Sequence, residues 1–203
     1  TEHTGNDSYT ITTAEELAGL AKLVYDSTTN FSEKTITLGA DIVLNDVSGA
    51  ASWNDDMTGL NDWTPIGLSS NPFAGTFDGG GHTVSGIYIS ASSDNQGLFG
   101  CLSSAEIKNV SVTDSYVKGG NFVGGVVGNS RNSMVQDCCN EGNVEGSGSY
   151  SGGVVGINDK NSTIQNCCNK GNVEGNNYVG GVAGVNSGEN GLVNCCNEGT
   201  VTG

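Results

Sequence analysis

The sequence predicts an all-β fold, a right-handed parallel β-helix with three strands in each coil. Glycine pairs begin at positions 124, 152 and 180, so the repeat returns every 28 residues. A fixed period of about 20–50 residues marks a solenoid, a propeller or an array. The apolar runs within each repeat are short, rich in Val and Ile and interrupted by Gly and Asn, which is the pattern of strands and turns. A propeller blade needs about 40 residues, so a coil of strands at residues 122–127, 134–139 and 143–144 fits better.

One helix is predicted ahead of the repeats. Thr13 and Glu16 have the spacing of a capping box, in which each side chain bonds a backbone N–H of the other residue. Apolar residues then follow at helical spacing and predict a helix over residues 14–25: Leu17, Leu20, Ala21 and Val24. We expect this helix to cover the first coil, where exposed strand edges would otherwise promote aggregation.

The remaining chain predicts a single domain over residues 9–203, after a flexible N-terminus at residues 1–8. Residues 34–96 should form irregular coils, and residues 97–203 the regular repeats. The repeat continues to Gly203 without a change in composition, whereas solenoids normally end in an atypical polar repeat. We therefore expect a fragment of a longer chain whose last coil presents an open edge.

Charge excludes several classes of partner. The 203 residues have a net charge of −15, with 7 basic residues and a single arginine, Arg131. Nucleic-acid binding needs a cluster of Lys and Arg that is missing here. No run of 18 apolar residues occurs, so we expect no membrane insertion by this segment. We expect a monomer located outside the cell or on a bacterial cell surface.

Several motifs occur in the order seen in GLUG-motif proteins. They are Ile11–Leu17, Thr35–Ile42, Trp63–Gly67, Gly75–Gly86, Gly97–Gly100 and the Val-Gly-Gly-Val repeats. The chain thus resembles the β-helical, non-catalytic region of large bacterial surface proteins, adhesins and immunoglobulin A1 protease-like proteins among them. The zinc protease of that family needs His-Glu-x-x-His. Here His3 and His82 are the only histidines and neither lies in such a motif, so this segment should carry no zinc centre.

The loop over residues 45–62 holds the candidate ligand-binding residues. Trp53 could stack on a sugar, with Asp55 and Asp56 beside it, whereas Trp63 should pack against the cap. Four carboxylates could bind Ca²⁺, which takes six to eight oxygens: Asp46, Asp55, Asp56 and Asp62. They lack EF-hand spacing, so a solvated acidic loop is the favoured interpretation. We expect no other cofactor.

No catalytic residues are predicted. Parallel β-helices can hold enzymes that act on polysaccharides through carboxylates grouped on one face. Here the acids fall at matched repeat positions beside turns, as in the pairs Glu141 with Glu198 and Glu145 with Glu174. A charge that recurs in each repeat is typical of a solvated face, whereas an active site is unrepeated.

Two side-chain columns should run along the repeats. Asn tolerates the left-handed backbone region and bonds nearby backbone, so stacked copies predict a ladder with Asn166 buried. The members of this ladder are Asn109, Asp137, Asn166 and Asn194. The second column consists of cysteines.

Adjacent strand residues point to opposite faces, so each Cys-Cys pair should split between the core and the surface. Cys138, Cys167 and Cys195 should point inward as small apolar side chains. Cys139, Cys168 and Cys196 should point outward. Free thiols are the favoured state because the Cα–Cβ bonds of stacked residues run parallel rather than toward each other. A disulfide in the outer column and a metal site are the alternatives.

The sequence therefore indicates a non-catalytic stalk or adhesion module, acting as a rigid spacer or an interaction surface. Its partner could be a glycan or a protein on a host or bacterial surface. The alternatives are a carbohydrate-binding module and an accessory region of a surface protease or glycan-active enzyme.

Overall fold

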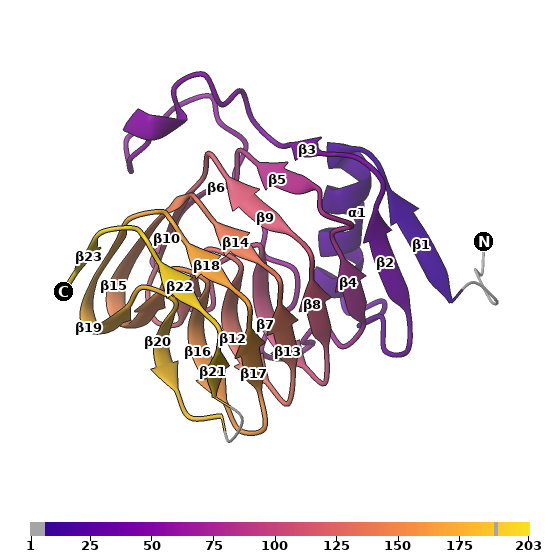
Figure 1. The fold of residues 1–203 in the computed structure, drawn as a ribbon. Coiled ribbons are helices and arrows are strands. Elements are labelled where there is room, and N and C mark those ends of the chain that lie inside the picture. The colour runs from indigo at the N-terminus through magenta and orange to yellow at the C-terminus, as the bar shows by residue number, and fades with distance from the viewer. Residues whose placement is uncertain (1–6, 189–190) are drawn as a thin grey trace.

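The computed structural model describes residues 7–188 and 191–203. It is a parallel β-solenoid whose strands stack into four sheets (Figure 1). The predicted fold class, the period of about 28 residues and the single N-terminal helix are confirmed. No helix in these two ranges is long and apolar enough to cross a membrane.

We name the four sheets A to D. Sheet A contains, in order of pairing, β1 (Ser8–Ile11), β2 (Thr35–Leu38), β4 (Thr76–Asp78), β8 (Glu106–Lys108), β13 (Met134–Gln136), β17 (Thr163–Gln165) and β21 (Leu192–Val193). Sheet B contains β3 (Ile42–Val43), β5 (Thr83–Ser85), β9 (Ser111–Thr113), β14 (Cys139–Asn140), β18 (Cys168–Asn169) and β22 (Cys196–Asn197). Sheet C contains β7 (Phe99–Ser103), β12 (Val127–Arg131), β16 (Val155–Asp159) and β20 (Ala183–Asn186). Sheet D contains β6 (Tyr88–Ser90), β10 (Tyr116–Gly119), β15 (Asn143–Gly152), β19 (Val173–Gly180) and β23 (Val201–Thr202), with β11 (Val123–Gly124) also paired to β15.

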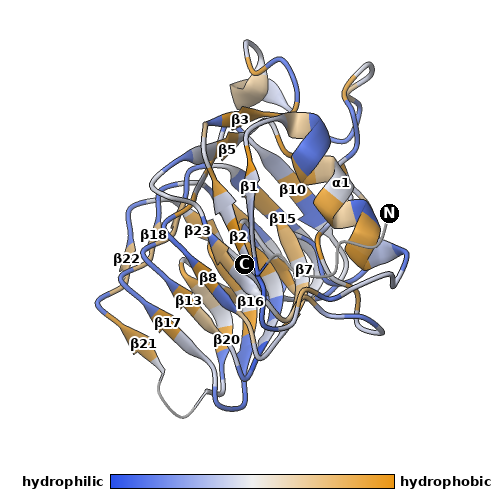
Figure 2. Ribbon diagram, turned by 90° about the vertical axis from the view of Figure 1, so that its right-hand side faces the viewer, coloured by the Kyte–Doolittle hydropathy of each residue, from blue (hydrophilic) through white to orange (hydrophobic). Residues whose placement is uncertain are grey.

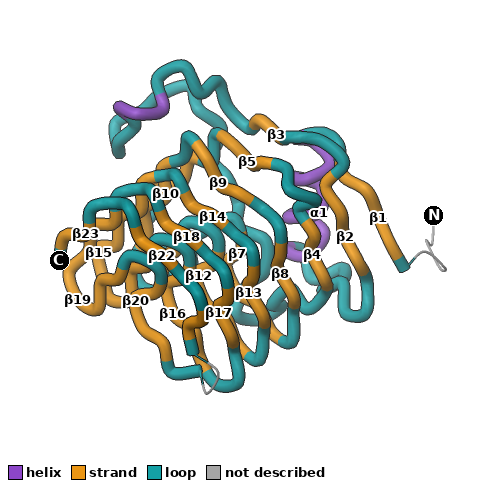
Figure 3. Tube along the Cα trace, viewed as in Figure 1, coloured by secondary structure: helices purple, strands orange, loops and turns teal. Residues whose placement is uncertain are grey.

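The expectation of three strands per coil is wrong, because the regular coils contribute to four sheets. The expected strand over residues 134–139 is split into β13 and β14 by Asp137, whose φ is 52°. A residue in the left-handed region turns the chain instead of extending it. Figure 3 shows the resulting alternation of short strands and corners around each coil.

Helix α1 (Ala14–Tyr25) lies at the N-terminal end of the stack, as the sequence predicted (Figure 1). The Thr13 hydroxyl accepts the backbone N–H of Glu16 at 3.2 Å. The Glu16 carboxylate accepts the N–H of Thr12 at 2.7 Å rather than that of Thr13, so the capping box is displaced by one residue. All four predicted apolar positions of the helix are buried in the common core. Figure 2 shows apolar residues recurring along α1, and the buried ones are those at helical spacing.

The core is built from columns of apolar residues that the parallel register stacks coil on coil. One column runs through Phe77, Ile107, Val135 and Ile164, all fully buried. The turn between β16 and β17 holds one residue more than the turn between β12 and β13. Arg131 pairs with Asp159, but three residues later Met134 pairs with Thr163, which lies four residues after Asp159. A register shift within β15 restores the spacing. The glycine-pair period therefore stays constant.

The last described coil has no coil above it. Strands β20, β21, β22 and β23 are each the end member of their sheets, and the side chains of Leu192, Val193 and Val201 are exposed. The open edge expected at this end is thus present. The flexible N-terminus expected at residues 1–8 falls mostly on residues 1–6, outside the described part, while Ser8 begins β1.

Candidate functional site

Trp53 does not form an exposed binding platform, so the prediction of a sugar-stacking residue at this position is wrong. Only 7% of its surface is exposed. Its ring packs edge-on against Tyr88 with centroids 5.9 Å apart, in a small cluster with Ala50 and Tyr116. The loop that carries Trp53 includes the 3-10 helix η1 (Ala50–Ser52) and folds back onto sheet D. Trp53 therefore anchors the loop to the coils.

Asp55 extends that anchor into a charged cluster, which we call the Asp55 clasp: Asp55, Tyr116, Lys118 and Glu145. The Lys118 ammonium contacts the Asp55 carboxylate and lies 2.7 Å from Glu145 Oε1. The Tyr116 hydroxyl lies 2.9 Å from Asp55 Oδ1 and 2.7 Å from Glu145 Oε2, and can donate to one at a time. The hydrogen bond from Lys118 lowers the pKa of Asp55. Burial, and then the two carboxylates, raises the pKa of Tyr116. The Asp55 carboxylate thus bonds Lys118 and Tyr116 within the fold and is not free for a ligand.

The four loop carboxylates that could bind Ca²⁺ do not come together. Among the described residues, the four loop carboxylates Asp46, Asp55, Asp56 and Asp62 make no group close enough to share an ion. Asp46 instead accepts the backbone N–H of Ser48 at 3.0 Å, which lowers the pKa of Asp46. Asp55 is neutralised by Lys118. Asp46 and Asp55 thus bond different parts of the fold, which keeps their carboxylates apart.

The predicted corner residues stack only in part as a ladder, since no side-chain bond joins Asn109 to Asp137 among the described residues. Asn109, Asp137, Asn166 and Asn194 all have φ between 52° and 54°. Asn109 Nδ2 donates to Asp78 Oδ1 at 3.0 Å, and Asn166 Nδ2 donates to Asp137 Oδ1 at the same distance. Asn166 is exposed, so the expectation that it is buried is wrong. A left-handed corner turns its side chain away from the core, which leaves the amides in solvent.

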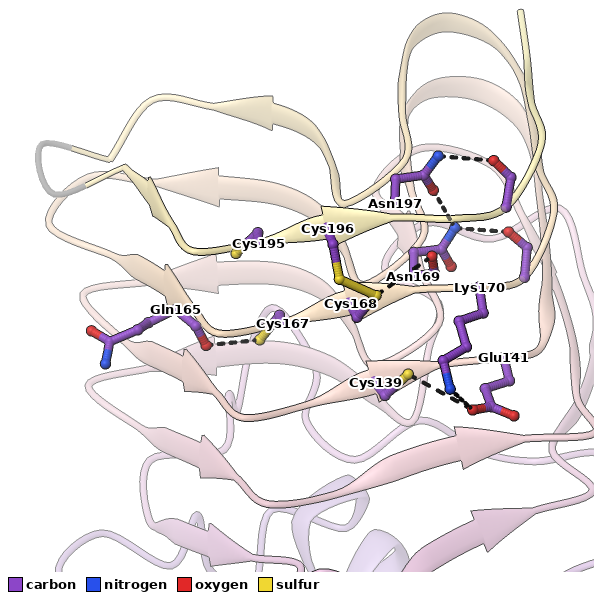
Figure 4. Close-up of a disulfide and its surroundings, with 12 residues drawn as sticks. Cys139, Glu141, Gln165, Cys167, Cys168, Asn169, Lys170, Cys195, Cys196 and Asn197 are labelled. Carbon is purple, nitrogen blue, oxygen red and sulfur yellow. Dashed lines mark hydrogen bonds and ion pairs between the residues drawn. A yellow bond between two sulfur atoms is a disulfide. The ribbon is translucent and has the colours of Figure 1, made fainter.

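A second, buried asparagine ladder was missed by the sequence reasoning. Asn140 and Asn169 have no exposed surface. Asn140 Nδ2 lies 2.8 Å from Asn169 Oδ1. Asn169 Nδ2 lies 2.8 Å from Asn197 Oδ1 (Figure 4). Each amide also donates to the carbonyl two residues on, as Asn169 does to Gly171 O at 2.7 Å. The signal was present as Cys-Cys-Asn-x-Gly in each repeat.

The cysteines divide between two faces as predicted. Cys138 and Cys167 are buried, whereas Cys139 and Cys168 are partly exposed and Cys196 is exposed. The Cys167 thiol donates to Gln165 O at 3.2 Å, as Cys138 does to Gln136 O at 3.1 Å. Gln136 O and Gln165 O already accept the backbone N–H groups of Asn109 and Asp137, so each inner thiol adds a second, weaker bond to a paired carbonyl.

Two outer cysteines are joined, so the expectation of free thiols is wrong for them. Cys168 and Cys196 form a disulfide with Cα atoms 4.6 Å apart (Figure 4). Parallel stacking places both sulfurs on the same outer face, and rotation about each Cα–Cβ bond suffices to bring them together. Cys139 lies one coil below and remains free. Cys168, Cys196 and Glu198 are close enough to share an ion, but the disulfide removes the two thiolates such a site would need.

An aromatic column also follows the repeats at a left-handed corner. The rings of Phe122, Tyr150 and Tyr178 stack with centroids 5.1 Å apart at both steps, inclined by 2° and 9°. The φ angles of these residues are 59°, 72° and 53°. Each lies two residues before the Gly-Gly pair of its repeat, so the pattern is visible in the sequence. The expectation of short strands did not by itself indicate that these rings stack.

Comparison with known proteins supports the fold. Halomucin from Haloquadratum walsbyi is 35% identical over 149 residues, which is 70% of this chain and 2% of halomucin. The chain thus spans a small part of that relative. A crystal structure of a candidate immunoglobulin A1 protease from Bacteroides ovatus superposes with a TM-score of 0.68 at 22% identity, covering 93% of this chain and 56% of that one. No family model matches, so the resemblance to GLUG-motif proteins stays a prediction.

Proposed function

We propose that the chain is a non-catalytic β-helical stalk of a secreted or surface-anchored bacterial protein, in which it acts as a rigid spacer. The observation that carries the proposal is the continuous stacking of all four sheets, reinforced by ladders of side chains on the same register. Backbone bonds join each coil to the next, and the amides and stacked rings reinforce the regular coils that carry them, from Phe122 to Asn197. Such a structure resists bending and sets a fixed distance between its ends.

The comparisons support the surface location. Halomucin is by name a mucin, and the Bacteroides ovatus protein shares the coil over most of this chain. The alternative of an accessory region within a surface protease draws on the same similarity. Incubation of the purified chain with immunoglobulin A1 and with polysaccharides tests the absence of catalysis. We expect no cleavage product. If cleavage disappears once the protein is purified to homogeneity, the activity belonged to a contaminant, whereas cleavage by the homogeneous chain would contradict the prediction.

Length is the property to test for a spacer. Residues 149–176 form one repeat, and three extra copies inserted after Asn176 should add three coils. Strands stack about 4.8 Å apart, so the maximum dimension in small-angle X-ray scattering should grow by about 14 Å. A Gly/Ser insert of equal length is the control, and it should raise amide hydrogen exchange instead. An insert of true repeats that unfolds, or leaves the dimension unchanged, would refute the spacer role.

A further inference from the structure

We infer that a groove between helix α1 and the outer face of sheet C binds a neutral oligosaccharide. Three adjoining hollows of about 310, 490 and 370 Å³ form it. The first two share Tyr25 and Trp63, and the last two share Ser69 and Asn95. Because neighbouring hollows share walls, the groove is continuous. We call it the Trp63 groove. The inference goes beyond the spacer role and does not depend on it.

The walls of the groove are held in place by the fold. Residues 67–72 leave sheet C between two bridges, Ile66 to Phe99 and Phe73 to Leu102, and stand off its outer face. Asn71 Nδ2 donates to Val24 O at 2.8 Å, which ties this loop to the end of α1. The Trp63 indole donates to Leu98 O at 3.2 Å. A preformed site of this kind loses little conformational entropy when a ligand binds.

Aromatic side chains occur along the whole groove. Tyr25 is 52% exposed and Phe122 lines the third hollow, whereas Trp63 is only 8% exposed and contributes little surface to the first two. Ligand sites combine such apolar surfaces with a few polar groups that fix orientation. A pyranose ring offers one apolar C–H face and a rim of hydroxyls, which matches this combination. A more voluminous hollow of about 600 Å³ beside sheet A has no aromatic side chain in its lining.

Unmet hydrogen-bonding capacity points to the same place. Asn95 Oδ1 and Asn129 Oδ1 are buried without a partner within the described chain, and both residues line the third hollow. Buried polar atoms are normally paired, so an orphan calls for a reason. An amide oxygen accepts hydrogen bonds, so a sugar hydroxyl that reached either side chain from the hollow could donate to it.

Charge favours a neutral ligand. The two cations along the groove are already paired: Lys22 with Asp26 at 2.8 Å, and Arg131 with Asp159 at 3.4 Å. Asp62 and Asp94 also line it, and the chain carries a net charge of −15. A polyanion would be repelled, whereas sugar hydroxyls can donate to both carboxylates.

An extended peptide is the less suitable occupant. Peptides that add to a sheet bind through unpaired backbone groups at an edge strand. Strand β7 is the end strand of sheet C, but Ile66 and Phe73 already bridge to it. The groove therefore offers side chains rather than a free backbone edge.

Binding is tested with the whole chain on an array of neutral hexose and N-acetylhexosamine oligosaccharides, followed by titration. In a Trp53→Phe background the remaining indole is Trp63, so a change in its fluorescence on binding locates the ligand. We expect Tyr25→Ala and Asn129→Ala each to weaken binding at least tenfold. Tyr178→Ala is the matched control, because Tyr178 is 62% exposed and lies outside the groove, and it should leave affinity unchanged.

Unchanged melting temperatures of the variants keep loss of binding distinct from loss of fold. The inference is overturned if no neutral oligosaccharide is retained, if only a peptide or a polyanion binds, or if Tyr25→Ala and Asn129→Ala bind as the parent does. Any of these results leaves the spacer role intact, since coil insertion measures length without a ligand.

Discussion

Replacing Asn169 by Ala should destabilise the protein strongly, because this amide lies at the centre of the buried ladder. Its Nδ2 donates to Gly171 O at 2.7 Å and to Asn197 Oδ1 at 2.8 Å, and its Oδ1 accepts from Asn140 Nδ2 at 2.8 Å. Alanine removes all three bonds at once. Asn140 Nδ2 and Gly171 O are then left in the interior, whereas Asn197 is exposed and water can replace its partner.

An orphaned buried polar group costs about 1–3 kcal/mol. Gly171 O bears this cost in full and Asn140 Nδ2, which keeps its bond to Gly142 O, bears it in part, so the free energy of unfolding should fall by about 2–4 kcal/mol. For a chain of this size, 1 kcal/mol corresponds to about 2–4 °C, which gives a fall in Tm of roughly 5–15 °C. The matched control is Asn166→Gly. Asn166 is exposed, and glycine keeps its left-handed backbone at φ 52°, so the control should cost less than about 0.5 kcal/mol.

Guanidinium denaturation under oxidising conditions, followed by circular dichroism and by tryptophan fluorescence, measures both variants. Two probes are needed because solenoids can unfold in parts. An Asn169→Ala variant as stable as the parent, or a control that loses more stability than it does, would refute the assignment of the buried ladder.

Four further results are expected. Cys196→Ser removes a disulfide that closes a loop with a sequence separation of 28 residues, and chain entropy sets the resulting loss in the free energy of unfolding at no more than about 4 kcal/mol. Native alkylation of the parent, read by mass spectrometry, should label Cys139 faster than the buried Cys138 and Cys167; equal labelling of all three would contradict the two-face arrangement. The pKa of Asp55 is lowered chiefly by the hydrogen bond from Lys118, so the clasp contributes stability above the unfolded pKa of about 3.9 and loses it as pH falls through the lower folded value. The carboxylate is 46% exposed, so Asp55→Asn should lower the free energy of unfolding by under about 1 kcal/mol at neutral pH and by nothing in strong acid. A loss of stability that grows on acidification would contradict this sign. Trp53→Ala should lower the free energy of unfolding by about 3 kcal/mol, since the ring is buried against Tyr88, yet leave oligosaccharide binding unchanged; a binding defect at unchanged stability would restore Trp53 as a ligand platform.

Tertiary structure overturned two expectations and added a groove that the sequence did not predict, because all three depend on contacts far apart in the sequence. Trp53 is buried by Tyr88, 35 positions further on, once its loop folds onto sheet D. The Cys168–Cys196 disulfide depends on side-chain rotation at the outer face, which strand direction alone does not define. The Trp63 groove brings together Tyr25, Asn95 and Phe122, and no local pattern links them.

The sequence by itself determined the coil, its period, the α1 helix and the inward or outward facing of each cysteine. These features repeat locally, so alternation along a strand and the apolar spacing of a helix define them without knowledge of the neighbours. Which asparagine of each repeat is buried was decided only by the tertiary structure. Asn166 and Asn169 lie three positions apart in one repeat, yet the left-handed corner at Asn166 turns that side chain to solvent, while Asn169 faces the interior between two coils. Burial there arises from the coils above and below, which only the folded stack supplies.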